Sequence, residues 1–237
     1  HLGRGSGNRL MGRVLATALE KFPGLRLAAI SGGQFDNVIC SRCDAVVALP
    51  TGSGAAFTAF IREFDAALKN EYAVTDPDVT LTCAAAEAAK AVPAERTATL
   101  VQALAAMPQG VEAMDTDFPG LVQTSLNMGV VKLNGDGLHI TFSIRSSIAS
   151  RKLMLAQRVR AVAALAGGTV AERGVYPGWQ YKRESKFRDT LLAAYKDLTG
   201  KDGVVEATHG GLECGLLMEK IPGLDAVSMG PELHDVH

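Results

Sequence analysis

The sequence predicts an α/β protein that opens with an α+β domain, in which helices cover one face of a mixed or antiparallel sheet, and closes with part of an α/β domain. Over the first 175 residues, segments with apolar residues every three or four positions alternate with short segments of alternating polarity. Two alternating runs flank the turn Asn134-Gly135-Asp136-Gly137, which is typical of a β-hairpin. From about Val175 the order changes to strand, helix and strand, so we expect a domain boundary near "GVYPGWQ" that separates residues 1–175 from residues 176–237.

Five longer segments are predicted to be helices. The first, "GSGNRLMGRVLATALEKFPG", repeats Leu10, Val14 and Ala18 on one face and ends at Pro23-Gly24. The other four follow the same rules, and they cover residues 54–72, 94–107, 150–168 and 185–200.

The predicted strands are shorter than the predicted helices and are less evenly spaced along the chain. Strands are predicted at residues 25–31, 37–50 and 79–86 and on both sides of the hairpin turn within residues 121–148, whereas residues 108–120 are predicted to form a loop. A strand and a turn are expected over residues 169–179. Residues 203–230 should hold a strand at Val204-Val205, a glycine-rich turn, a short helix and a last strand.

The composition excludes several classes of protein. The 237 residues are 47% hydrophobic and 21% charged, with a formal net charge of -1, which gives no reason to expect nucleic acid or an anionic membrane as a partner. No apolar run has the length of a membrane span. Four cysteines in a chain of this length do not indicate a disulfide framework, so we expect a cytoplasmic protein.

Cys40 and Cys43 form a C-x-x-C pair with three interpretations. A structural zinc site would need two further ligands, and a redox pair usually lies at a helix N-terminus. This pair lies inside a predicted strand, and Cys83 and Cys214 have no matching spacing. We therefore favour ordinary buried thiols, with a zinc or redox module as the alternative.

Arg145 lies near the end of the second hairpin strand, in "ITFSIRSSI". The pattern is compatible with a solvated or salt-bridged arginine. It is also compatible with a guanidinium that binds a carboxylate through two parallel hydrogen bonds.

The segment "THGGLECGLL" follows a predicted strand and opens a short helix. Glycines at such a turn allow a ligand to approach the backbone closely, near the amide groups of the helix N-terminus. A histidine, His209, and a glutamate, Glu213, on this turn beside Gly211 make it a candidate binding site, although a tight turn with a capping glutamate would give the same pattern.

The chain closes with "HDVH", in which His234 and His237 are possible metal ligands. Two histidines do not form a site, because zinc normally takes three or four protein ligands. A solvated tail and one edge of a larger metal site are both compatible with these residues.

Six motifs in order, "QTSLNMGVV", "IRSSI", "GVYPGWQ", "HGGLECGLL", "PGLDAVSMGP" and "HDVH", resemble the cytosolic nonspecific or aminoacyl-histidine (Xaa-His) dipeptidases, a branch of the di-zinc metallopeptidases. The opening "HLGRGSGNRLMGRVL" is similar to the first helix of the family's lid domain. The resemblance covers essentially the whole chain. It implies a lid and dimerisation domain in residues 1–175 and the C-terminal segment of a catalytic domain in residues 176–237.

The resemblance also implies roles for particular residues. His237 matches the last zinc-ligand histidine of the family, whereas His234 is not expected to be a ligand. Arg145 and Asn8 match lid residues that hold the substrate carboxylate, and Gly211 and Glu213 fall in the turn that lines the substrate cleft. The cofactor would be zinc, two ions in each complete site, and the partners would be a dipeptide substrate and a second copy of the chain.

The other metal ligands and the general-base glutamate of the family match no residue of this sequence, so the catalytic residues stay unknown. We therefore expect a fragment of a dipeptidase that is inactive alone. The alternative is a non-catalytic dimerisation or ligand-binding module that keeps the lid fold.

Overall fold

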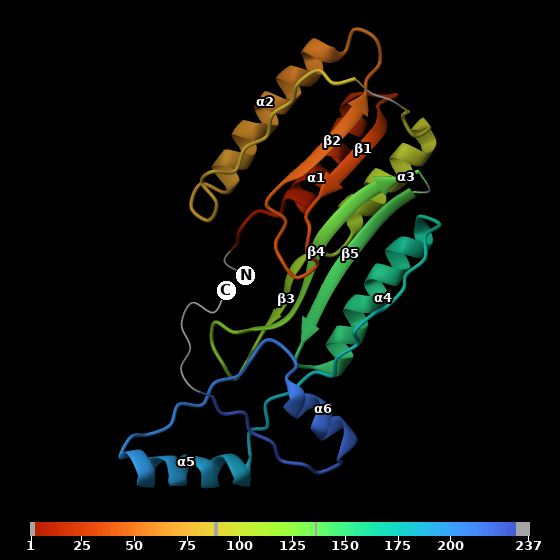
Figure 1. Cartoon of the computed structure of the whole chain (residues 1–237). Coiled ribbons are helices and arrows are strands. Elements are labelled where there is room, and N and C mark those ends of the chain that lie inside the picture. The colour runs from red at the N-terminus through yellow and green to blue at the C-terminus, as the bar shows by residue number, and fades with distance from the viewer. Residues whose placement is uncertain (1–2, 88–89, 136, 231–237) are drawn as a thin grey trace. The chain divides into compact units, whose positions relative to one another are not determined.

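The computed structural model describes residues 3–87, 90–135 and 137–230 (Figure 1). These residues belong to two compact units. Unit 1 comprises His1–Val111, Leu126–Ile144 and Leu155–Ala171, and unit 2 comprises Glu112–Ser125, Arg145–Met154 and Glu172–His237. The predicted division at residue 175 was drawn from the sequence alone, and it stays a prediction.

The secondary structure alternates between helices and short groups of strands. In chain order the elements are α1 (Gly7–Lys21), β1 (Arg26–Gly32), β2 (Cys43–Ala48), α2 (Gly54–Glu71), α3 (Ala94–Ala106), β3 (Gly110–Met114), β4 (Val122–Asn134), β5 (Gly137–Ser146), α4 (Ala149–Leu165), α5 (Lys186–Thr199) and α6 (Glu213–Lys220). All five predicted long helices are confirmed within a few residues. The predicted hairpin is confirmed as well, since β5 pairs with β4.

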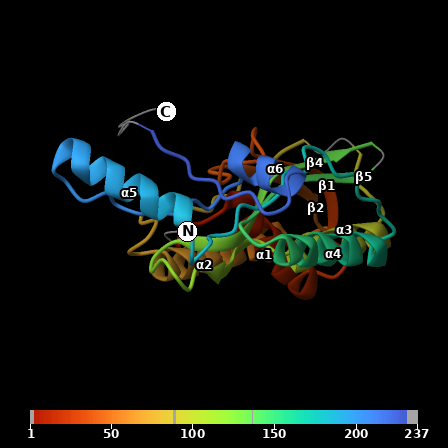
Figure 2. The same cartoon turned by 90° about the horizontal axis from the view of Figure 1, so that it is seen from below.

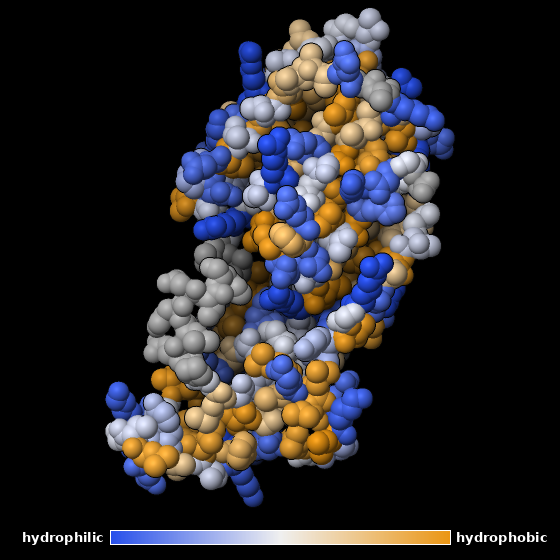
Figure 3. Space-filling model, viewed as in Figure 1, coloured by the Kyte–Doolittle hydropathy of each residue, from blue (hydrophilic) through white to orange (hydrophobic). Residues whose placement is uncertain are grey.

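The strands form a five-stranded sheet in the order β2-β1-β4-β3, with β5 also paired to β4. β1 runs antiparallel to both β2 and β4. Helices α1 to α4 lie on one side of the sheet (Figure 2), as the predicted fold class requires. The uncovered face of the sheet faces the viewer in Figure 3, where hydrophilic and hydrophobic side chains are interspersed.

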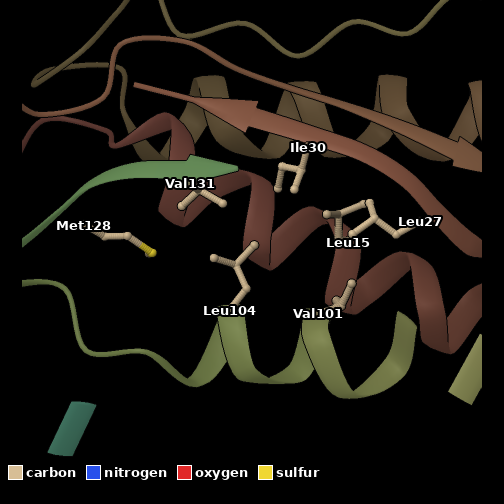
Figure 4. Close-up of a cluster of buried hydrophobic side chains, with 7 residues drawn as sticks. All are labelled: Leu15, Leu27, Ile30, Val101, Leu104, Met128 and Val131. Atoms are coloured by element: carbon tan, nitrogen blue, oxygen red, sulfur yellow. The ribbon is translucent and has the colours of Figure 1, made fainter. Parts of the chain in front are cut away.

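The core of unit 1 lies between the sheet and these helices. One cluster joins α1, β1, α3 and β4 (Figure 4). Leu27 and Ile30 both reach it although they are three residues apart, because a register shift between Leu27 and Ala29 inserts one extra residue in β1. The members of this cluster are Leu15, Leu27, Ile30, Val101, Leu104, Met128 and Val131.

Helix α4 packs through a smaller cluster, in which Leu155 and Val159 contact Leu126 on β4. A third cluster covers the contact of α1 with α2. It consists of Val14, Ala18, Leu25, Phe60 and Ile61.

Several predicted strands are wrong. Residues 79–86 lie in no strand, and residues 169–179 and 203–230 contain no strand either. Conversely, β3 lies inside the segment predicted to be a loop. A strand exists only where a neighbour satisfies its backbone groups, which an alternating pattern does not guarantee.

Within the described ranges, no helix is both long and apolar enough to cross a bilayer.

Candidate functional site

The candidate site lies in unit 2 and starts at the end of the hairpin. The Ser147 amide donates to the carbonyl of Gln123 at 3.2 Å, and the hydroxyls of Thr124 and Ser146 lie 2.8 Å apart. These contacts define the register of the β4–β5 pair. In this register, Ser125 on β4 lies opposite Arg145 on β5. Directly opposite residues point to the same face of a sheet, with Cβ atoms about 5 Å apart.

Arg145 is exposed, and it has no hydrogen bond or ion pair with any residue that the structure describes. None of its guanidinium donors is used by a residue in the described ranges, so they can serve a ligand. A carboxylate is the anion whose two oxygens match this planar fork.

His209 reaches the same place from the glycine-rich turn. Its Nε2 lies 2.9 Å from the Oγ of Ser125, although 84 residues separate the two in sequence. Burial lowers the pKa of His209, and the positive charge of Arg145 lowers it further. The ring is therefore neutral at pH 7, and Arg145, Ser125 and His209 form a cationic, hydrogen-bonding group.

Glycines allow the backbone segments of the site to touch. A Cβ at Gly178 would lie 2.5 Å from the carbonyl oxygen of Ser147, and one at Gly211 would lie 2.5 Å from that of Pro177. One at Gly215 would lie 3.2 Å from the Gly178 oxygen. The end of β5, the segment of residues 176–179 and the turn that carries His209 therefore lie in direct backbone contact.

Replacing Gly211 by alanine should destabilise the chain by roughly 1–3 kcal/mol, because the new methyl group meets a carbonyl that moves only with its backbone. The neighbouring Gly210 is a matched control, since a Cβ there meets nothing within 4 Å. Urea unfolding of both variants measures the difference. Equal midpoints for G210A and G211A would contradict the tight contact.

Glu213 is exposed and begins α6, where a carboxylate is favoured by the helix dipole. The structure thus places Arg145, Gly211 and Glu213 in one unit. Their role in substrate binding stays a prediction.

Asn8 is placed differently, in unit 1 and in the first turn of α1. Its side chain is completely buried, and its Nδ2 donates to the carbonyl oxygens of Met128 at 2.9 Å and Gly129 at 3.2 Å. These bonds join α1 to β4. The contact that the resemblance implies between Asn8 and a substrate carboxylate also stays a prediction.

The cysteine pair lies beside Asn8. Cys40 is in the loop before β2, not in a strand, and Cys43 is the first residue of β2. Burial raises the pKa of the Cys40 thiol. Burial, followed by the neighbouring Cys40 and Asp44, raises the pKa of the Cys43 thiol to about 12. Protonated thiols react slowly in disulfide exchange, and within the described ranges no third histidine, cysteine, aspartate or glutamate joins the pair as a metal site.

We expect Cys40 and Cys43 to react slowly with iodoacetamide at neutral pH, because the thiolate is the reactive form and burial holds both thiols protonated. The exposed Cys83 is the internal reference. Peptide mass spectrometry over a pH series gives each rate, and labelling of Cys43 should still be rising at the highest pH at which the chain stays folded. Rapid labelling of both at pH 7 would contradict this expectation.

The metal-binding predictions fall mostly outside the described residues. His234 and His237 lie beyond residue 230, the last one that the structure describes. Among the described residues, no three histidine, cysteine, aspartate or glutamate side chains come together as a metal site. The described residues therefore do not form a zinc centre by themselves.

Ser125 was not predicted as a site residue, and His209 was considered in its turn but was assigned no role. The histidine was visible in the glycine-rich turn, but its partner on β4 could not be found from spacing. Their contact depends on how the turn folds back over the hairpin.

Comparison with known proteins gives three consistent matches. Residues 1–76 match the family model described as the peptidase dimerisation domain. The whole chain is 32% identical, over 238 residues, to the C-terminal part of the cytosol non-specific dipeptidase of Escherichia coli K12, and it covers 49% of that protein. The crystal structure of the aminoacylhistidine dipeptidase from Vibrio alginolyticus matches 98% of this chain with a TM-score of 0.90 and 32% identity.

This chain covers 47% of the Vibrio protein, so it spans about half the length of the relatives that it matches. The antiparallel sheet with helices on one face agrees with the fold of these dipeptidases. Over essentially its whole length the chain is similar to about half of an aminoacylhistidine dipeptidase and of a cytosol non-specific dipeptidase.

Proposed function

We propose that the chain forms the lid and the C-terminal catalytic segment of a metal-dependent dipeptidase that hydrolyses dipeptides such as Xaa-His. The observation that carries this proposal is the guanidinium of Arg145, which has no partner among the described residues and whose charge acts on His209 in the turn of Gly211. Its relatives are named as dipeptidases, which supports the reaction class.

Arg145 gives this function its physical basis. A bidentate contact with the terminal carboxylate fixes one end of the substrate at a defined distance from the reacting carbonyl. A substrate of two residues places its only peptide bond at that distance, whereas a longer peptide displaces its first peptide bond. Glu213 and the backbone of Gly211 would contact the rest of the dipeptide.

Zinc is the cofactor that we propose, with two ions in the complete site, and His237 would contribute one imidazole nitrogen. The remaining ligands would come from sequence that these 237 residues do not include. The described residues do not form the metal centre by themselves, and we expect the 237 residues alone to be inactive.

We further propose a cytoplasmic homodimer. The match of residues 1–76 to a peptidase dimerisation domain supports the dimer. β2 is at one end of the strand order, and such an edge strand can pair with another chain. The cytosolic name of the Escherichia coli relative supports the location.

A non-catalytic dimerisation or ligand-binding module with the lid fold is the second candidate. The observation that favours it is a site for an anion in a chain whose described residues form no metal site. Such a module would bind dipeptides without cleaving them.

The deciding experiment uses the protein expressed from its complete open reading frame. We expect it to cleave glycylglycine, to lose this activity after chelation and to regain it with zinc. Triglycine and glycylglycinamide should be poor substrates. Binding of glycylglycine without turnover in the zinc-loaded protein would favour the module, and no binding at all would reject both candidates.

A further inference from the structure

We propose that His209 is a second contact for the carboxylate that Arg145 binds, and that Ser125 holds the histidine ring in position for it. This inference rests on the proposed function, because it takes the ligand of Arg145 to be the terminal carboxylate of a dipeptide. It adds a positioning and specificity residue that the motifs did not identify.

The placement of the three side chains carries the argument. Ser125 lies opposite Arg145 across the β4–β5 pair, and the Oγ of Ser125 lies 2.9 Å from Nε2 of His209. Ser125 thus contacts the imidazole directly and lies at the cross-strand position of Arg145. The backbone contact of Gly211 with Pro177 fixes the turn, so the ring has little freedom to leave.

One ring nitrogen of His209 remains available. Nε2 faces Ser125, whereas Nδ1 has no hydrogen-bond partner among the residues that the structure describes. A half-buried imidazole with one open nitrogen beside a free guanidinium is suited to a ligand that accepts hydrogen bonds and carries negative charge.

A bound carboxylate would change the charge balance at this histidine. Arg145 is the charged side chain among the described residues whose field lowers the pKa of His209, and the hydroxyl of Ser125 is the hydrogen-bond partner of the ring. A carboxylate on Arg145 offsets that field and accepts a hydrogen bond from the protonated ring. The pKa of His209 should therefore rise on binding, and by linkage the protonated site should bind the carboxylate more tightly.

The test follows the ring signals of His209 by NMR in the 237-residue chain. The probes are glycylglycine and glycylglycinamide, which differ in the terminal carboxylate. H209Q assigns the signals by their loss, and His139 on β5, in the other unit, is the reference. We expect glycylglycine to raise the pKa of His209 and the amide to leave it unchanged.

Two further results are expected. The affinity for glycylglycine should fall about fivefold or more as the pH rises through the pKa of His209. The R145M variant should show a higher pKa of His209 without ligand and no response to glycylglycine. S125A, which keeps the guanidinium and the imidazole, should weaken the response.

Three outcomes are possible besides the expected one, and each has a distinct meaning. If glycylglycine shifts the signals around Arg145 but not the titration of His209, the inference fails and the proposed function stands. If both probes shift His209 equally, the ring senses the peptide and not the carboxylate, which also overturns the inference. If neither probe shifts any signal, the carboxylate site at Arg145 fails, and the inference fails with it.

Discussion

R145M in the complete protein should lower kcat/KM for glycylglycine by about a hundredfold or more without lowering the melting temperature. The guanidinium would make two hydrogen bonds to the substrate carboxylate, and their loss removes roughly 3 kcal/mol of binding to the transition state. Stability should not change, because Arg145 is exposed and has no partner among the described residues.

R26M is the matched control. Arg26 is an exposed arginine at the start of β1 and likewise has no hydrogen bond or ion pair within the described part of the chain. Steady-state kinetics on glycylglycine and glycylglycinamide separate the effects, because R145M should remove most of the preference for the free carboxylate. The assigned role would be contradicted if R26M lost as much activity as R145M. It would also be contradicted if R145M kept the preference for glycylglycine over glycylglycinamide.

The helices and the hairpin could be predicted from local sequence because their signals are local. The spacing of Leu10, Val14 and Ala18 sets the buried face of α1 without reference to the rest of the chain. The turn after Asn134 likewise forces two neighbouring runs to pair, whatever lies beside them.

The missed strands depended on partners that local sequence does not contain. Residues 79–86 alternate like a strand but lie in no sheet, whereas the short β3 has weak alternation and is a strand because it pairs with β4. The same holds for Val204-Val205, which have strand-forming side chains and no neighbouring strand in the described chain.

In the candidate site, too, some residues could be predicted from local sequence and others could not. Arg145, Gly211 and Glu213 stand in motifs that can be read from the sequence. The hydrogen bond of His209 with Ser125 could not be predicted, because the two residues are 84 positions apart in sequence. The turn that carries His209 is held near the strand by close contacts between glycines and carbonyl groups, which local sequence does not reveal.

N8D should lower the free energy of unfolding at pH 7 by about 3 kcal/mol or more, the largest stability effect that we expect. The amide Nδ2 of Asn8 donates to the carbonyl oxygens of Met128 and Gly129, and a carboxylate oxygen in its place would face both carbonyls without a proton. N8A, which leaves the two carbonyls without this donor, should cost about 2 kcal/mol.

The pH dependence of N8D distinguishes a structural role from a substrate contact. Burial and the two carbonyls should raise the pKa of the new carboxyl in the folded state above its unfolded value of about 3.9. The folded state then binds the extra proton more tightly, so the stability of N8D relative to the parent should recover as the pH falls toward the unfolded pKa and decrease as it rises through the folded pKa. Urea unfolding of the parent, N8A and N8D over a pH series measures this.

If both variants unfold like the parent at every pH but lose dipeptide binding, Asn8 serves the substrate carboxylate as the resemblance implies. If the stability loss follows pH as described, the bonds from Asn8 to β4 hold α1 on the sheet, and any loss of activity in these variants reflects the folding of unit 1.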